Sequence, residues 1–119
     1  MIENIEDICK TLLEVSAAYK INELKILEKT KSIIKARLYV FEDIYVQIYV
    51  NIKKPKKSFT LVLNDKRIFG KDYIFGQWHL HPFENQEYYD ESEKGRESVA
   101  VKEFVEEALS IIYEKIKLL

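Results

Sequence analysis

The sequence predicts a single α+β domain spanning residues 1–119, in which an antiparallel sheet of about five strands is flanked by an N-terminal and a C-terminal helix. Two kinds of periodicity support this fold class. Apolar residues recur every three or four positions near both ends of the chain, whereas they alternate with polar residues through the middle. A chain of 119 residues has the size of one domain with a modest core.

The first periodic segment predicts a helix of about four to five turns. Its apolar face comprises Ile2, Ile5, Ile8, Leu12, Val15 and Tyr19, with Cys9 and Leu13 beside them. Acidic Glu3, Glu6 and Asp7 lie in its first turns, where they suit the positive end of the helix dipole. We expect the helix to end at residues 20–22.

The alternating segments predict strands with one buried and one wetter face. Their apolar positions are Leu24 and Ile26; Ile34, Ala36, Leu38 and Val40; Ile44, Val46, Ile48 and Val50; and Phe59, Leu61 and Leu63. Residues 41–43 form a tight hairpin connection, residues 53–57 a basic loop, and residues 64–66 a turn. Residues 70–76 are interpreted as a further connection, which leads to a last strand at residues 78–81.

The closing segment predicts a surface loop followed by a helix. Residues 85–95 are polar and acidic, and Ser98 can cap the helix that follows. The apolar face of this helix comprises Val101, Phe104, Val105, Ala108, Leu109, Ile112 and Ile116.

The composition is that of a soluble globular protein, with 47% hydrophobic and 33% charged residues. No apolar run approaches the roughly 20 residues that a membrane helix needs, and the acidic N-terminus lacks the basic region of a signal peptide. The lone Cys9 excludes an internal disulfide and suits a reducing compartment. We therefore expect a cytoplasmic protein with no membrane association.

The charges are distributed unevenly along the chain. Residues 20–72 carry a net charge of +7, whereas residues 1–19 carry −3 and residues 73–119 carry −5. A basic central block suits a phosphate-rich ligand bound by the sheet. Lysines that only solvate the exposed faces of strands would give the same charge distribution.

His79 and His81 are the strongest candidates for a functional site. Residues two apart on a strand share a face, and a pair of imidazoles can share acid–base work near neutral pH. Such a pair suits RNA cleavage, in which one imidazole takes the proton of the 2′-hydroxyl and the other protonates the leaving oxygen. Asp72 could orient one ring. The cation that steadies the phosphorane could be Lys66, Arg67 or Lys71.

Other uses of these residues remain open. Two histidines on one strand could bind a metal, with Glu84, Asp90 or Glu93 as further ligands. The main interpretation requires no metal and no cofactor. Cys9 is a poor nucleophile candidate because it lies on the buried side of its helix. A last set of candidates could stack bases or could be ordinary strand formers: Tyr39, Tyr45 and Tyr49.

Three stretches resemble the TumE-like toxins of prokaryotic type II toxin–antitoxin modules. They are Ile34-Lys-Ala-Arg-Leu-Tyr-Val, Phe59-Thr-Leu-Val-Leu-Asn-Asp-Lys-Arg-Ile-Phe-Gly-Lys-Asp72, and Trp78-His-Leu-His-Pro-Phe83, followed by an acidic closing helix. Asp72 matches the family's aspartate, and His79 and His81 match its histidine-rich strand. Tyr73 stands where the family usually has asparagine. The resemblance implies a growth-inhibiting toxin neutralised by a cognate antitoxin, and the histidine pair with the basic sheet adds RNA as the expected target.

A second, local resemblance is to the JAMM metalloprotease core, carried by Gly76-Gln-Trp-His-Leu-His-Pro82. It implies two zinc-binding histidines, although Leu80 replaces the hydroxyl residue of that family. The alternatives to a ribonuclease toxin are therefore a JAMM-like zinc hydrolase and a non-catalytic module that binds RNA or protein. The expected partners are an antitoxin, RNA and a second copy of the chain in a homodimer.

Overall fold

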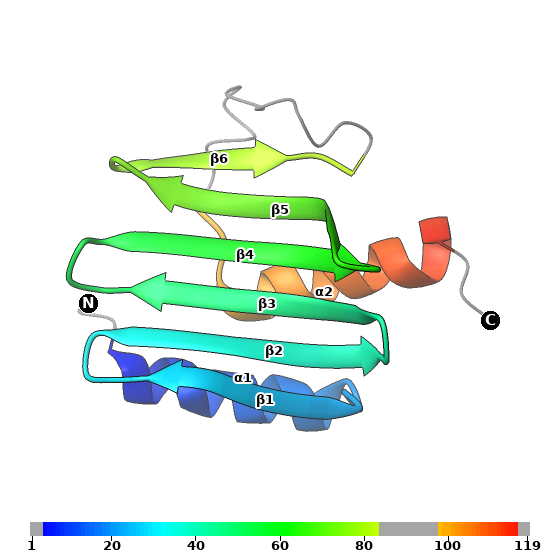
Figure 1. Ribbon diagram of the computed structural model, residues 1–119, viewed down its shortest axis with the longest axis horizontal. Coiled ribbons are helices and arrows are strands. Elements are labelled where there is room, and N and C mark those ends of the chain that lie inside the picture. The colour runs from blue at the N-terminus through cyan, green and yellow to red at the C-terminus, as the bar shows by residue number, and fades with distance from the viewer. Residues whose placement is uncertain (1–3, 84–97, 117–119) are drawn as a thin grey trace.

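The computed structural model describes residues 4–83 and 98–116, which form a six-stranded antiparallel sheet with two α-helices on one of its faces (Figure 1). In chain order the elements are α1 Ile5–Ala18, β1 Glu23–Lys29, β2 Ile33–Phe41, β3 Ile44–Asn51, β4 Lys56–Leu63, β5 Lys66–Ile74, β6 Gln77–His81, α2 Val101–Ile111 and the short π-helical segment η1 Ile112–Ile116. The predicted α+β class is confirmed, with six strands in place of about five.

The sheet is a simple meander in which each strand pairs with its neighbours in the sequence. Two of its connections are two-residue turns with positive φ angles, at Asn64–Asp65 and at Phe75–Gly76. Such turns match the right-handed twist of the strands that they join. All three turns that follow an odd-numbered strand lie at one end of the sheet, on the left in Figure 1.

The largest departure from the sequence-based expectation is β5. The sequence predicts a connection at residues 70–76, but residues 70–74 continue β5 and pair with β4 on one side and β6 on the other. The register between β4 and β5 shifts at Leu61 and Val62, so Ile68 is an extra residue opposite this step. This β-bulge interrupts the period of two on which the strand predictions rely.

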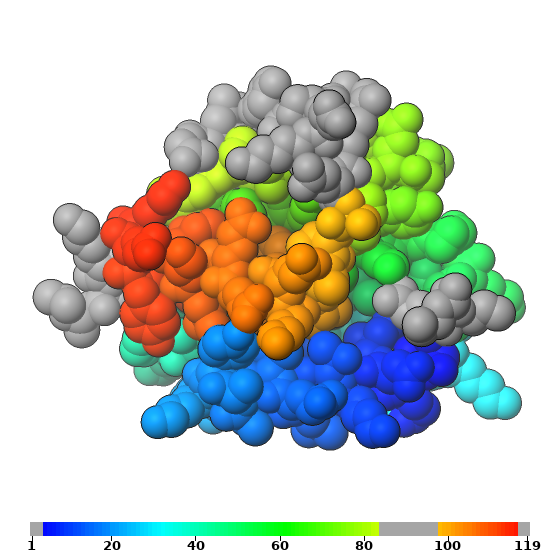
Figure 2. All heavy atoms as spheres, turned by 180° about the vertical axis from the view of Figure 1, so that it is seen from behind, coloured from blue at the N-terminus to red at the C-terminus, as the bar shows by residue number. Residues whose placement is uncertain are grey.

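The hydrophobic core lies between the sheet and the two helices, which lie side by side over the back of the sheet in Figure 2. Phe104 of α2 is buried at its centre. Its ring lies 5.6 Å from that of Phe59 on β4 and 5.3 Å from that of Phe69 on β5. Trp78 of β6 extends this cluster, with its ring 5.8 Å from that of Phe59. The core thus reaches the hairpin that carries the histidines.

The helix boundaries follow from local capping. The side chain of Asn4 accepts a hydrogen bond of 2.8 Å from the backbone N–H of Asp7, so α1 begins at Ile5. Ser98 is not the cap of α2, because the helix begins three residues later. There the carboxylate of Glu103 accepts a hydrogen bond of 2.9 Å from the backbone N–H of Ala100. The predicted loop at residues 85–95 lies outside the described residues, as does Ile2. None of the described helices has the length and apolar character needed to cross a membrane.

Candidate active site

The sheet face opposite the two helices carries polar and aromatic side chains. We call it the polar face. Strand alternation and register assign it Lys35, Arg37 and Tyr39 of β2; Tyr45, Gln47 and Tyr49 of β3; Ser58 and Thr60 of β4; Arg67, Gly70 and Asp72 of β5; and Gln77, His79 and His81 of β6. Both histidines therefore lie on the face turned away from the core helices, as their spacing predicts.

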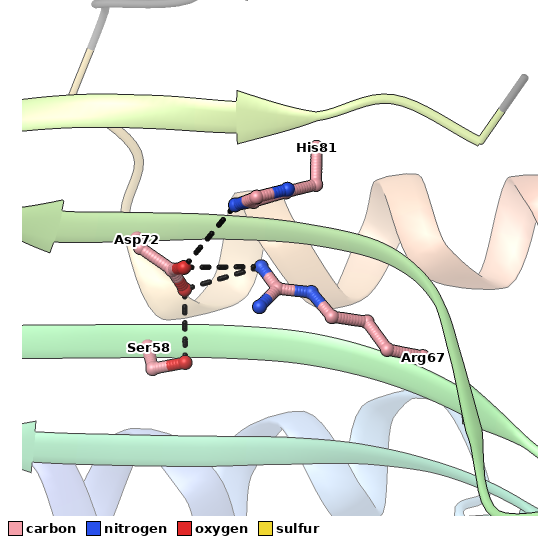
Figure 3. A network of polar contacts seen from close by, with 4 residues as sticks. All are labelled: Ser58, Arg67, Asp72 and His81. Atoms are coloured by element: carbon pink, nitrogen blue, oxygen red, sulfur yellow. Dashed lines mark hydrogen bonds and ion pairs between the residues drawn. The ribbon is translucent and has the colours of Figure 1, made fainter. Parts of the chain in front are cut away.

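Asp72 is the centre of a polar cluster that spans three strands (Figure 3). Its Oδ1 accepts a hydrogen bond of 2.9 Å from the Ser58 hydroxyl on β4. Nη2 of Arg67 lies 3.2 Å from each of its two carboxylate oxygens. Nε2 of His81 on β6 lies 3.5 Å from Oδ2. Because the Asp72 side chain is only 8% exposed, these partners compensate a carboxylate that is largely removed from water.

The β-bulge at Ile68 brings Arg67 to this cluster. Residues 67 and 72 are an odd number of positions apart, so a regular strand would place them on opposite faces. The extra residue shifts the alternation by one, and Arg67 pairs with Val62 on the polar face. Bulges commonly redirect a side chain next to a functional site.

Gly70 provides the space that the Arg67 guanidinium occupies. A Cβ atom added to Gly70 would lie 2.6 Å from Nε and 2.7 Å from Cζ of Arg67, closer than real Cβ contacts come. The guanidinium therefore passes closely over the backbone of β5 on its way to Asp72. A glycine in a strand often marks such a close approach.

The two histidines relate differently to Asp72. His79 pairs directly with Asp72 across β5 and β6, whereas His81 pairs with Gly70. The carboxylate nevertheless makes its contact with His81, diagonally across the strands. His81 is buried and His79 is half-buried. One imidazole is thus held against an anion, while its neighbour on the same face is the more accessible of the two.

The three candidate cations separate in the structure. Arg67 joins the cluster around Asp72. Lys71 lies on the opposite face of β5, between Phe59 and Leu80 in the register, and is buried on the core side. Lys66 is exposed at the start of β5, where it pairs with Leu63. The three cations are close in sequence, but the fold brings only Arg67 to the face that carries the histidines.

The candidate tyrosines lie on the polar face of β2 and β3. The rings of Tyr39 and Tyr45 are 5.2 Å apart, and the Arg37 guanidinium lies 4.5 Å from the centre of the Tyr45 ring. Arg37 also donates hydrogen bonds to Gln47, at 3.0 Å, and to the Tyr39 hydroxyl, at 3.2 Å. The bond to Tyr39 is the main cause that raises the pKa of Arg37, so this guanidinium stays charged.

The remaining sequence candidates gain no support from the described residues. Within residues 4–83 and 98–116, no three His, Cys, Asp or Glu side chains gather as metal ligands would. Glu84, Asp90 and Glu93 lie outside that part of the chain. Burial raises the pKa of the Cys9 thiol in α1, which disfavours the reactive thiolate.

Comparison with known protein families, curated proteins and solved structures finds no match for this chain.

Ser58 is the cluster residue that the sequence analysis missed, together with the link between Arg67 and Asp72. The alternation from Phe59 to Leu63 places Ser58 on the polar face, but only the register with β5 reveals that it lies opposite Asp72. The polar face thus carries an imidazole in contact with Asp72, a second imidazole and a guanidinium. Those are the groups needed for proton transfer at an anionic centre.

Proposed function

We propose that this protein is the toxin of a type II toxin–antitoxin module and that it cleaves RNA with His79 and His81. The observation that carries the proposal is the contact of Asp72 with both Arg67 and His81 on the polar face, with His79 alongside. The resemblance of the chain to the TumE-like toxins supports the biological role. A cytoplasmic location and neutralisation by a cognate antitoxin belong to the same proposal.

In the proposed reaction, His79 acts as the general base because it is the more accessible imidazole. It removes the proton of a ribose 2′-hydroxyl, and the resulting oxygen attacks the adjacent phosphorus. His81 acts as the general acid and donates a proton to the departing 5′-oxygen. The products are a 2′,3′-cyclic phosphate and a 5′-hydroxyl. Each step uses the protein's own side chains.

Asp72 and Arg67 assist this reaction in distinct ways. The carboxylate holds the His81 ring in place and stabilises positive charge on it while it carries the proton to be donated. The guanidinium lies beside the same carboxylate, and the Arg67 side chain is 32% exposed, so the residue is partly accessible to a phosphate. It can stabilise the charge that develops on the phosphorane oxygens.

A cleavage assay on defined oligonucleotides tests the proposal. Purified wild type is incubated, in the presence of a chelator, with a labelled single-stranded RNA and with a DNA of the same sequence. We expect RNA to be cleaved to 2′,3′-cyclic phosphate ends and DNA, which has no 2′-hydroxyl, to remain intact. His79→Ala and His81→Ala should each reduce the rate by at least about a hundredfold, the usual contribution of general acid–base catalysis.

Gln77→Ala is the matched control, because Gln77 lies on the same strand and face but is exposed at its start. It should cleave RNA as the wild type does. Growth after induction adds the cellular test: the wild type should arrest growth and the double histidine variant should not, at equal accumulation. RNA binding without cleavage would instead indicate a non-catalytic module, and stoichiometric zinc with hydrolysis lost on chelation would indicate the hydrolase.

A further inference from the structure

Phe75 occupies a conformation and an environment that are both unfavourable for phenylalanine. It is 97% exposed and has a φ angle of 53°. Left-handed backbone costs a bulky residue about 1–2 kcal/mol, and turns of this kind favour glycine, asparagine or aspartate. Exposure adds a second cost, since the ring forgoes all the stabilisation that burial provides. A strained, exposed residue of this kind suggests a function outside the folding of the chain.

The position of Phe75 connects it with the proposed catalytic residues. It lies in the two-residue turn between β5 and β6, the hairpin that carries Asp72, His79 and His81. Strand pairing continues up to this turn, with Tyr73 opposite Trp78 and Ile74 opposite Gln77. The backbone at its tip is therefore held by the sheet at a set position relative to the site.

A basic turn lies beside it. The register pairs Lys57 of β4 with Tyr73 of β5, so Lys56 lies level with Ile74, one residue before Phe75. Adjacent strands are about 4.8 Å apart. Lys53, Lys54 and Lys56 are all exposed in or next to the turn between β3 and β4. This turn and that of Phe75 lie at the same end of the sheet (Figure 1).

The opposite end of the sheet carries mixed charges, because the exposed Lys66 lies beside the acidic residues there. The turn between β2 and β3 presents Glu42 and Asp43, and that between β4 and β5 presents Asp65, all exposed. A polyanion is therefore attracted to the end that carries Phe75, where Lys53, Lys54 and Lys56 are all exposed cations. An exposed aromatic ring beside a row of cations is the combination with which proteins hold single-stranded nucleic acid.

We propose that Phe75 stacks on a base of a single-stranded RNA whose phosphates contact Lys53, Lys54 and Lys56, and that it thereby anchors the strand beside the histidines. This inference rests on the proposed function, since it names the form of the substrate and one of its anchors. Stacking accepts any base, so the anchor favours unpaired RNA without selecting its sequence.

Binding is measured in the His79→Ala, His81→Ala double variant, which keeps the RNA intact. A fluorescently labelled oligouridine reports affinity, with and without the further substitution Phe75→Asn. Asparagine suits a positive φ, so the substitution removes the ring while keeping the turn. We expect affinity to fall by about 5- to 150-fold, the range for loss of one stacked base, and the melting temperature to stay the same or rise.

Two comparisons sharpen this test. Tyr113→Asn removes another exposed aromatic ring, on η1 at the helix side, and should leave affinity unchanged. An oligonucleotide of abasic sites should bind the Phe75→Asn variant and its parent equally, since there is no base to stack. Replacing Lys53 and Lys54 by glutamine should lower the salt dependence of binding by about two phosphate contacts.

The outcomes separate the inference from the proposed function. If the parent double variant binds no RNA, both are wrong. If it binds RNA and Phe75→Asn binds equally well, only the anchor is wrong. Unchanged RNA affinity together with loss of neutralisation by an antitoxin would assign Phe75 to a protein interface and overturn the stacking proposal.

Discussion

The hydroxyl of Tyr19, at the C-terminal end of α1, donates a hydrogen bond to the carboxylate of Glu106 in α2. The two residues are 87 positions apart in the sequence. Their hydrogen bond joins the two helices that together cover the core face of the sheet. Because the proton of the phenol is shared with a carboxylate, the bond raises the pKa of Tyr19 above its ordinary value of 10.0.

This contact predicts a pH-dependent contribution to stability. The folded state holds the phenolic proton more tightly than the unfolded chain, so the stabilisation is complete below the unfolded pKa and is lost as pH rises through the folded pKa. Tyr19→Phe should therefore lower the midpoint of urea unfolding at pH 7, and this difference should disappear as pH rises through the folded pKa of Tyr19, which lies above 10.0. A difference that persisted at high pH would mean that the ring, not the hydroxyl, stabilises the fold.

Gly70→Ala should disconnect Arg67 from Asp72. The new Cβ would meet the guanidinium, which must move because the backbone of β5 is fixed between two strands. We expect RNA cleavage to fall by about tenfold or more, as removal of charge stabilisation usually has this effect. Gly76→Asn is the matched control: Gly76 has a φ angle of 76° and no atom within 4 Å of the place that a Cβ would take, so cleavage should be retained. Equal rates in both variants would argue against a role for Arg67.

Asp72→Asn should weaken both catalysis and folding. The amide keeps the shape of the side chain but removes the charge that Arg67 and His81 meet. Loss of charge-assisted hydrogen bonds at a buried site typically costs about 1–3 kcal/mol of unfolding free energy. Ser58→Ala, which removes a single neutral donor to the same carboxylate, should cost less. Comparing urea unfolding and cleavage rates in the two variants separates the contribution of the charge from that of the hydroxyl.

Phe104→Ala should destabilise the whole domain. Its buried ring contacts Phe59 and Phe69, and truncation of a core phenylalanine costs about 3–5 kcal/mol. Unfolding by urea should shift to a lower midpoint with an unchanged slope. Leu13→Ala in α1 is the control, since that side chain is 63% exposed and its loss should be nearly neutral. A similar loss in both variants would place the core elsewhere.

Strand segments with regular alternation could be predicted from the sequence, whereas the full extent of β5, which a bulge interrupts in its middle, could not. From Ile34 to Leu38 and from Ile44 to Val50 the side chains alternate regularly, because both strands have one face against the helices. In β5 the extra residue Ile68 and the small Gly70 interrupt the pattern, so part of this strand resembles a connection. A bulge depends on the partner strand and leaves no unique local signal.

The candidate site was predictable to the same extent. The shared face of His79 and His81 follows from their spacing of two and holds in the structure. The selection of Arg67 over Lys71 could not be made, because it depends on which residues the bulge turns to each face. Closeness in sequence correctly indicated the segment that contains the cation, but strand alternation places Arg67 and Lys71 on opposite faces of β5.

The meander has a consequence for the order in which the chain can fold. Every strand pairs with its immediate neighbour, so the sheet can assemble hairpin by hairpin through short loop closures, which favours fast folding. The hydrophobic core forms more slowly than the hairpins, because the aromatic rings of β4 and β5 are buried only when α2, which is distant in the sequence, docks on them. Until then the apolar side of β4 and β5 is exposed to other chains, and the docking of α2 ends that exposure.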